Sequence, residues 1–350
     1  MMFSIPKMAR AAVLEELGMP LVVRDISIPK LISGQVLVKV FFSGVCRSQL
    51  MEVSGGRGCD PWLPHLLGHE GSGEVLAVGK DVTKVKPGDQ VILGWLKSEG
   101  MDAPGAKYEH CGRIINSGPV TTFSNYTVVS ENRLVKKPKR LSFEEAVLFG
   151  CALPTGMGMV LNELHPKQGQ SVIVLGLGGI GLAALVTLKA LGISNVIAVD
   201  RSDEKLIIAR DLGVKILNSK KENLHQLIAQ ITNGGADICI ESAGSVETIE
   251  LGFSLIKKNG GKLLFASHPP DGQHIKLIPH ELISGKSIAG SWGGGTRPDR
   301  DIPKMNDVLE SANISLKRLI SKQYFLEEIN QALSDLEQGF AFRPIIIMNH

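Results

Sequence analysis

The chain has 350 residues, and at about 150 residues per domain this length allows two domains. Hydrophobic residues make up 43% and charged residues 21% of the sequence, which excludes disorder as a description of the whole chain. The net charge is +3, and the basic run at 136–139 holds only four residues. This balance argues against nucleic acid as a partner.

Five cysteines, at positions 46, 59, 111, 151 and 239, are odd in number and widely spaced. They do not form a disulfide framework, so a cytoplasmic location is expected and metal or catalytic roles have to be considered. The N-terminal stretch lacks the apolar core of a secretory signal. The longest uncharged apolar stretch, 172–188, is interrupted by glycines and is shorter than about 18 residues, so no membrane span is predicted.

The first half of the chain is predicted to be a β domain. Short β-rich segments at 21–26, 35–45, 71–79 and 89–93 are separated by turn residues, including Pro-Gly and Gly-Asp pairs. Spacing of this kind is typical of a barrel or a sandwich.

After residue 168 the pattern changes to alternating strands and helices. Apolar strands are predicted at 171–175, 195–200, 236–241 and 262–267, with helical patterns between them, as in a parallel sheet covered on both faces. From residue 301 the sequence is mostly amphipathic helix and ends in the apolar strand at 344–348. We therefore predict an α/β protein with a β domain, a doubly wound nucleotide-type domain and a short return segment.

The most specific motif is the glycine-rich turn formed by Gly176, Gly178 and Gly181, between an apolar strand and a helix. In a G-x-G-x-x-G turn the first glycine permits the tight turn, the second lets the backbone approach a pyrophosphate, and the third allows close helix packing. The phosphates then lie at the helix N-terminus, where backbone N–H groups attract anions. The motif predicts dinucleotide binding.

Asp200 ends the second strand, 19 residues after the last glycine of the motif. An acidic side chain there accepts hydrogen bonds from the adenosine ribose and repels a 2′-phosphate, which favours NAD over NADP. The adjacent Arg201 weakens this preference, because arginine is the residue that a 2′-phosphate recruits.

A second constellation consists of residues far apart in the sequence. Cys46 follows a predicted strand, His69 and Glu70 precede another, and Cys151 lies near the domain boundary. Two thiolates and one imidazole would leave the fourth position of a tetrahedral zinc open, as in a catalytic site. An isolated cysteine in an apolar run is usually a packing residue, and His69 by itself could be a core histidine. Because no CxxC or HxxxH motif brings the ligands together, the spacing alone favours packing over metal binding.

Seven sequence motifs together carry a family resemblance: GVCRS, LLGHEGSGEV, VKPGDQVI, TFSNYTVV, LFGCALPTG, VIVLGLGGIG and VIAVD. Their order and spacing resemble the zinc-dependent medium-chain dehydrogenase/reductase (alcohol dehydrogenase) family, and most closely its class I and class III branch. The resemblance covers nearly the whole chain. It implies a GroES-like β-barrel catalytic domain at 1–155, completed by 296–350, and a Rossmann NAD-binding domain at 156–295.

The resemblance also assigns roles to individual residues. It implies that Cys46, His69 and Cys151 bind zinc, that Glu70 lies beside the metal as an occasional ligand, and that Ser48 takes the alcohol proton. The cofactor-binding residues that it implies, together with those of the glycine motif, are Arg47, Thr155, Gly176, Gly178, Gly181, Asp200, Arg201, Lys205 and Arg343. Trp95 resembles a pocket-lining position.

Three departures from the family pattern stand out. Gln49 occupies the place of an aspartate that usually contacts the histidine ligand, and a neutral amide cannot match that charge. Met51 stands where some members end the proton relay with histidine, so the relay must finish on water or another group. The region 94–119 contains only Cys111 in place of a four-cysteine cluster, so one catalytic zinc per chain and no structural zinc are expected. Three other residues could also be metal ligands, but surface or packing roles are the simpler interpretation for them: Cys59, His65 and His110.

The leading prediction is a cytoplasmic enzyme that transfers hydride between a small-molecule alcohol or aldehyde (or ketone) and NAD(H), working as a homodimer or homotetramer. Two alternatives stay open at this stage. One is a biosynthetic dehydrogenase for a sugar-derived or phosphorylated alcohol, and the other is a non-catalytic NAD-binding protein of the same fold. A zinc-free NADPH-dependent reductase is disfavoured, because Cys46, His69 and Cys151 occur together.

Overall fold

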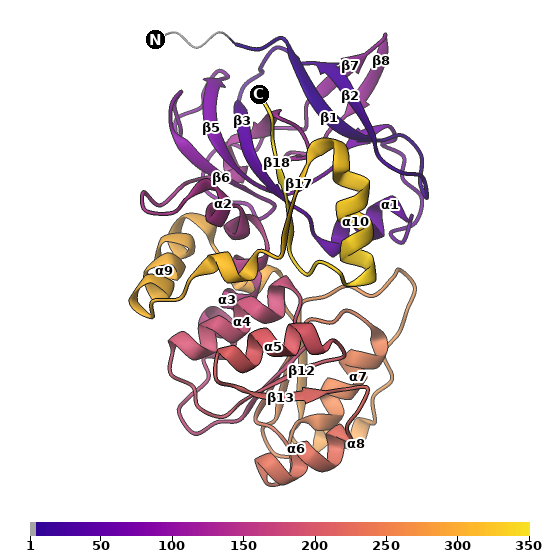
Figure 1. The fold of residues 1–350 in the computed structure, drawn as a ribbon, viewed down its shortest axis with the longest axis vertical. Helices are drawn as coiled ribbons and strands as arrows, with labels where there is room; N and C mark the ends of the chain where they lie inside the picture. The colour runs from indigo at the N-terminus through magenta and orange to yellow at the C-terminus, as the bar shows by residue number, and fades with distance from the viewer. Residues whose placement is uncertain (1–4) are drawn as a thin grey trace. The chain divides into compact units, whose positions relative to one another are not determined.

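The computed structural model describes residues 5–350 and divides them into two compact units (Figure 1). The first unit contains residues 5–151, Arg297–Pro303 and Leu316–His350. The second contains Ala152–Thr296 and Lys304–Ser315, so that helix α9 (Pro298–Ser311) contributes to both. The boundaries drawn from the sequence, at 155/156 and 295/296, stay predictions.

Strands of the first unit form a closed barrel and a second sheet. The barrel runs in the order β1 (Met8–Leu14), β2 (Val22–Ser27), β7 (Lys107–His110), β8 (Arg113–Asn116) and β4 (His65–Leu66). The second sheet runs in the order β10 (Leu134–Lys136), β6 (Gln90–Gly94), β5 (Glu70–Val78), β3 (Gln35–Gly44), β18 (Pro344–Ile347) and β17 (Lys322–Phe325). Strand β9 (Tyr126–Ser130) also pairs with β3.

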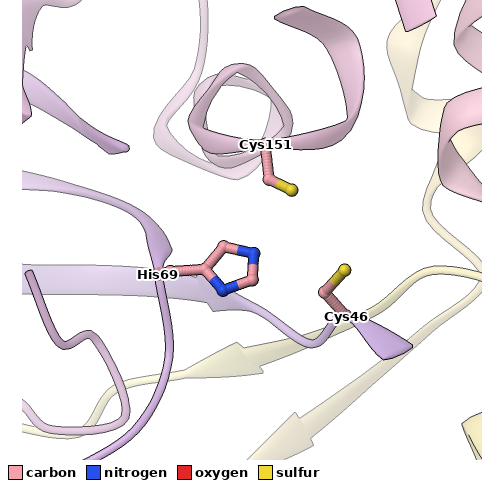
Figure 2. Close-up of side chains that lie close together, drawn as sticks. All are labelled: Cys46, His69 and Cys151. Carbon is pink, nitrogen blue, oxygen red and sulfur yellow. The ribbon is translucent and has the colours of Figure 1, made fainter. Parts of the chain in front are cut away.

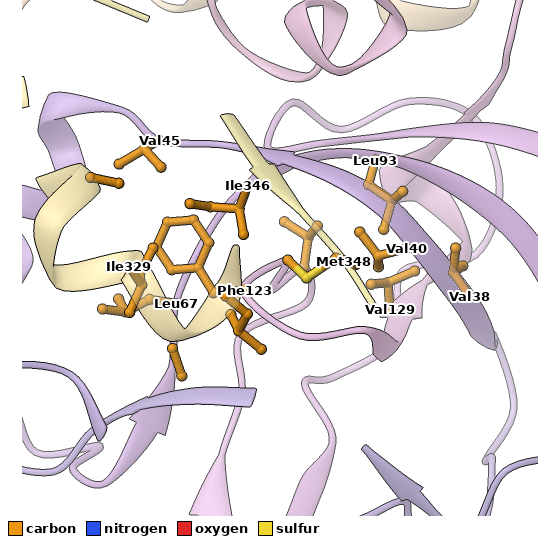
Figure 3. Packing of buried hydrophobic residues seen from close by; sticks show 14 of the residues in the cluster. Val38, Val40, Val45, Leu67, Leu93, Phe123, Val129, Ile329, Ile346 and Met348 are labelled. Carbon is orange, nitrogen blue, oxygen red and sulfur yellow. The ribbon is translucent and has the colours of Figure 1, made fainter. Parts of the chain in front are cut away.

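The return segment is part of the core of the first unit. β18 lies antiparallel to β3, with Ile346 opposite Ser43, and α10 (Ile329–Gln338) covers the same core. Figure 3 shows Ile329, Ile346 and Met348 packed among apolar side chains from the first 130 residues. Burial of these residues fixes β18 beside β3, although about 300 positions separate the two strands in the sequence.

The second unit is a six-stranded parallel sheet. Its order is β13 (Lys215–Asn218), β12 (Val196–Asp200), β11 (Val172–Leu175), β14 (Ile238–Glu241), β15 (Lys262–Phe265) and β16 (Ser287–Gly290). Helices α4 (Gly179–Ala190), α5 (Asp203–Asp211), α6 (Leu224–Thr232), α7 (Val246–Leu255) and α8 (Pro279–Ile283) connect these strands. The strand order reverses between β11 and β14, which makes this edge the expected ligand site of a doubly wound sheet.

The sequence-based α/β class, with a barrel and a doubly wound sheet, is confirmed. β3, β5, β6, β11, β12, β14 and β15 lie where apolar runs predicted strands. β13, β16 and the β7–β8 hairpin were not predicted, because none of these strands contains more than two consecutive apolar residues or a clear alternation of apolar and polar residues.

No single helix among the described residues is long and apolar enough to span a membrane. The consecutive helical segments Phe143–Gly150 and Ala152–Leu164 meet that length and composition only when they are taken together as a bent pair.

Candidate metal centre and nucleotide-binding turn

Three potential ligand side chains converge in the first unit. Cys46 follows β3 and caps helix α1 (Arg47–Val53), His69 directly precedes β5, and Cys151 follows the short helix Val147–Gly150. Their ligand atoms all lie within 4.8 Å of one another. Figure 2 shows both sulfurs and one ring nitrogen of His69 facing the same space. Within residues 5–350 this is the one such group of three histidine, cysteine or acidic side chains.

Two glycines beside the cysteines leave room for the side chain of Glu70. A Cβ added at Gly44 would lie 2.6 Å from Cδ of Glu70, and one at Gly150 would lie 2.6 Å from Cβ of Glu70. These distances are too short for a methyl group unless Glu70 or the backbone around it shifts. The glycines of the GVC and FGC motifs therefore make space for a carboxyl group beside both cysteines.

Glu70 is fully buried and forms an ion pair with Arg343, which directly precedes β18. Burial raises the pKa of Glu70 to about 7, although the guanidinium of Arg343 opposes this shift. The Oε1 atom of Glu70 has no hydrogen-bond partner among the described residues. Arg343 is thus paired with a carboxylate of the first unit, and its expected contact with the pyrophosphate of the cofactor stays a prediction.

The three ligand residues shift one another's pKa values. A hydrogen bond from Cys151 holds the pKa of the Cys46 thiol well below its usual range. The same bond, together with burial, raises the pKa of Cys151. Burial lowers the pKa of His69, but contact with the Cys46 thiolate outweighs it, so the net shift is upward. Negative charge is therefore concentrated on sulfur at this point.

The donor set fits zinc. Nε2 of His69 is buried and has no hydrogen-bond partner within residues 5–350, so a buried polar atom here calls for a ligand. Two sulfurs and one imidazole nitrogen are the protein ligands of a catalytic zinc, with the fourth position open. Cys46, His69 and Cys151 would hold the ion, and Glu70 lies beside them.

Ser48 and Gln49 contact the other ring nitrogen of His69. The Oγ atom of Ser48 lies 3.5 Å from Nδ1 of His69, and Nε2 of Gln49 lies 2.6 Å from it. The amide of Gln49 also donates to Oγ of Ser48 over 3.2 Å. The structure therefore places Ser48 beside His69, and its role as the acceptor of the alcohol proton stays a prediction.

The glycine-rich turn lies between β11 and α4 in the second unit, and its three glycines have different surroundings. Gly176 has φ +91°, and a Cβ there would meet the backbone N of Ala243 at 2.6 Å. A Cβ at Gly181 would meet the carbonyl O of Gly176 at 1.9 Å. A Cβ at Gly178 would meet no atom within 4 Å. The protein itself thus requires glycine at 176 and 181, whereas the open space at Gly178 fits a ligand that approaches the backbone closely.

Asp200 lies beside this turn at the end of β12. Its carboxylate accepts hydrogen bonds from the backbone N–H of Leu177, over 2.6 Å, and of Ser202, over 2.9 Å. Lys205 is half-buried and Arg201 is exposed nearby in the sequence. The glycine turn and Asp200 are therefore brought together in one unit. Thr155 is buried in α3 (Ala152–Gly158) of the same unit, and Arg47 is exposed at the start of α1 in the first unit.

The sequence matches the alcohol dehydrogenase GroES-like domain over residues 32–139 and the zinc-binding dehydrogenase family over residues 179–311. It is 30% identical to alcohol dehydrogenase class-3 of Zea mays over 368 aligned residues, which cover 97% of this chain and 96% of that protein.

The chain belongs to the zinc-dependent medium-chain alcohol dehydrogenase family.

Solved structures agree with this membership. Benzyl alcohol dehydrogenase from Acinetobacter calcoaceticus superposes with a TM-score of 0.88 at 29% identity, covering 98% of this chain and 100% of that one. An alcohol dehydrogenase zinc-binding domain protein from Burkholderia ambifaria superposes with a TM-score of 0.90 at 28% identity, covering 98% and 99%. As a member of this family, the protein is an oxidoreductase with the zinc-binding and nucleotide-binding parts of an alcohol dehydrogenase.

Glu241, at the end of β14, is a site residue that the sequence analysis missed. Its buried carboxylate accepts hydrogen bonds from the backbone N–H groups of Ala243 and Gly244, and from the hydroxyls of Thr248 and Ser267. Because Ala243 packs against Gly176, Glu241 holds the loop after β14 against the glycine-rich turn. An acidic residue in the apolar run ICIE was the only signal.

The loop around Met101 is held by a buried carboxylate. Cys111 lies exposed in the turn of the β7–β8 hairpin. The buried Glu131 accepts hydrogen bonds from the backbone N–H groups of Thr83, Lys84 and Met101, at 2.6–2.7 Å. A carboxylate with three N–H donors thus fixes the loop around Met101 in a region that contains a single cysteine.

Proposed function

We propose that the protein oxidises a small alcohol to an aldehyde or ketone, and catalyses the reverse reaction, with NAD(H) and with one zinc bound by Cys46, His69 and Cys151. The observation that carries this proposal is the convergence of two sulfurs and a ring nitrogen within 4.8 Å. These residues are up to 105 positions apart in the sequence, and packing alone does not require two thiolate sulfurs and an imidazole nitrogen to meet.

Bound zinc would polarise the alcohol or carbonyl oxygen as a Lewis acid. The residues of the chain would bind and orient the groups around it. Ser48 receives the alcohol proton at Oγ, since this hydroxyl is half-buried beside His69 and accepts a hydrogen bond from Gln49. Met51, on the same helix, has no group that carries a proton, so the proton leaves Ser48 through water or through a cofactor hydroxyl. Glu70 and Arg343 pair their charges beside the ligands and so keep the buried charge balanced.

NAD(H) is the proposed cofactor. The open space at Gly178 and the N-terminus of α4 would take the pyrophosphate, and the carboxylate of Asp200 would accept hydrogen bonds from the adenosine ribose. A 2′-phosphate would bring negative charge to that carboxylate, which supports NAD over NADP. The remaining proposed contacts with the cofactor are those of Arg47, Thr155, Arg201, Lys205 and Arg343.

A single zinc per chain is the proposed stoichiometry. Among the described residues only one group of histidine, cysteine or acidic side chains satisfies the geometry of a metal site, and Cys111 has no second cysteine near it in the sequence. The loop that would hold a second zinc is fixed by the Glu131 carboxylate.

A homodimer or homotetramer is proposed for the assembly. β16 is the edge strand of the parallel sheet, and it pairs only with β15 within residues 5–350. Ile278, directly before α8, and Ile283, at the end of α8, are exposed, and Ile283 is 81% accessible. An unpaired strand edge next to exposed apolar side chains favours association. Light scattering distinguishes a monomer from both assemblies.

The function is tested by NADH formation, measured at 340 nm with a panel of primary, secondary and aromatic alcohols including benzyl alcohol. We expect activity with zinc and NAD in the wild type, and a loss of at least 1,000-fold (on the order of 4 kcal/mol) in the double variant Cys46→Ser, Cys151→Ser. The Cys59→Ser variant is the matched control, because this cysteine is exposed and lies outside the cluster. Absence of NADH with every alcohol in the zinc-loaded wild type contradicts the proposal.

A further inference from the structure

The buried amide of Gln49 forms hydrogen bonds with two groups, the backbone of Cys46 and the ring of His69. Its Oε1 atom accepts a hydrogen bond from the backbone N–H of Cys46 over 2.9 Å. Its Nε2 atom lies 2.6 Å from Nδ1 of His69. Gln49 is 1% exposed, so water does not compete for either contact.

The backbone of Cys46 fixes the orientation of this amide. A backbone N–H only donates, so the amide atom that faces it must be the oxygen. The atom that faces His69 is then the NH2 group, which also only donates. Nδ1 of His69 must therefore accept with its lone pair, and a neutral ring carries its single proton on Nε2.

This arrangement opposes the ring state that a zinc ligand needs. Nε2 is the nitrogen that faces the sulfurs of Cys46 and Cys151 (Figure 2), and a ligand nitrogen must present a lone pair there. The proton would then be on Nδ1 and would need an acceptor. Gln49 can supply one only if its amide turns over, and its NH2 group then faces the N–H of Cys46. Two donors would oppose each other in a buried place, which costs free energy.

A carboxylate at this position has no such conflict, because one oxygen can accept from Cys46 and the other from Nδ1 of His69. We propose that Gln49 is a positioning residue that holds His69 with its proton on Nε2 and thereby weakens zinc binding. This inference rests on the proposed zinc site. It concerns the strength of that site, which is a separate quantity from the reaction carried out there.

The first test is the ring state of His69 in chelator-treated protein labelled with ¹⁵N-histidine. Long-range ¹H–¹⁵N correlation spectra distinguish the two neutral forms, and the His69 signals are assigned by their absence in His69→Asn. We expect the proton on Nε2 in the wild type and on Nδ1 in Gln49→Glu, which has the length of glutamine. A wild-type ring with its proton on Nδ1 overturns the proposal, whether or not zinc binds.

The second test is the zinc dissociation constant, measured by competition with a chromophoric chelator. Gln49→Glu should bind zinc about 10- to 100-fold more tightly than the wild type. Gln49→Met is the matched control for charge, because it removes the NH2 donor and adds no negative charge. It should also bind zinc several-fold more tightly, whereas a purely electrostatic effect would leave its affinity at the wild-type value.

A zinc affinity that changes less than twofold in both variants overturns the proposal. The melting temperature of the chelator-treated protein serves as the control for folding, since Gln49 is buried in the first unit. If the ring states and affinities are as expected but no alcohol is oxidised, the proposed function fails and this inference stands.

Discussion

The glycine-rich turn allows nucleotide binding to be separated from folding by a single methyl group. Gly178 has φ −79° and ψ −168°, which alanine adopts without strain, and the added Cβ would meet no atom within 4 Å. In Gly178→Ala, two effects on the free energy of unfolding oppose each other. The unfolded chain loses conformational freedom, which stabilises the folded protein by about 0.5–1 kcal/mol, and the helix loses a favourable N-cap residue, which costs about the same. The melting temperature without cofactor should therefore change by less than about 2 °C.

The same methyl group would occupy the space proposed for the pyrophosphate. Displacing the phosphate from one backbone N–H removes a charge-assisted hydrogen bond of about 1.5–3 kcal/mol. The dissociation constant for NADH, measured by fluorescence titration, should therefore rise about 10- to 150-fold.

Gly181→Ala is the contrasting variant for this prediction. Its Cβ would lie 1.9 Å from the carbonyl O of Gly176, so the backbone must move. The expected cost is about 1–3 kcal/mol of unfolding free energy, visible as a lower melting temperature before any NADH is added. An NADH affinity of Gly178→Ala within twofold of the wild type would refute the placement of the pyrophosphate.

Three further predictions concern buried carboxylates. Glu131→Gln places an NH2 group against a backbone N–H donor, which should lower the unfolding free energy by about 1–3 kcal/mol. A thermal melt should show the same loss of stability with and without chelator. A loss seen only without chelator would indicate that a metal binds at Glu131. Glu241→Ala should weaken NADH binding several-fold in the fluorescence titration, while Glu241→Gln, which keeps an acceptor for the loop amides, should stay close to the wild type. Hydrogen bonds from Lys322 and Tyr324 lower the pKa of Asp335 in the folded protein to about 2. The ionised carboxylate therefore contributes its full stabilisation above the pKa of unfolded Asp, about 3.9, and loses it as the pH falls through about 2. The difference in melting temperature between wild type and Asp335→Asn should therefore be constant near pH 7 and shrink towards zero between about pH 4 and 2. A difference that stays constant between about pH 4 and 2 would contradict the stabilising role of the Asp335 carboxylate.

The sequence predicts the fold class well, because the two halves of the chain have different periodicities. Apolar runs of three or four residues mark the central strands of both sheets, and turn residues separate them. The short edge strands β13 and β16 are not predicted, because their burial depends on neighbours that pair with them only in the folded sheet.

The candidate site is predictable in its ligands and much less so in the groups around them. Cys46, His69 and Cys151 lie in motifs that resemble a known family, whereas the ion pair of Glu70 with Arg343 joins residues 273 positions apart. Such a pair follows from the register of β18 against β3, which depends on tertiary packing. The sequence shows that Gln49 replaces an aspartate, but only the structure shows that its oxygen is already engaged by Cys46.

The most direct test of the zinc-dependent reaction is a reconstitution titration. Zinc is added stepwise to chelator-treated protein at a concentration well above the dissociation constant, and the rate of NADH formation is followed with saturating alcohol and NAD. The proposed function predicts that the rate rises linearly and stops rising at one zinc per chain, and that Cys46→Ser, Cys151→Ser shows no rise. Full activity without zinc, no activity at any zinc concentration, or a plateau reached only at two zinc ions per chain would contradict it.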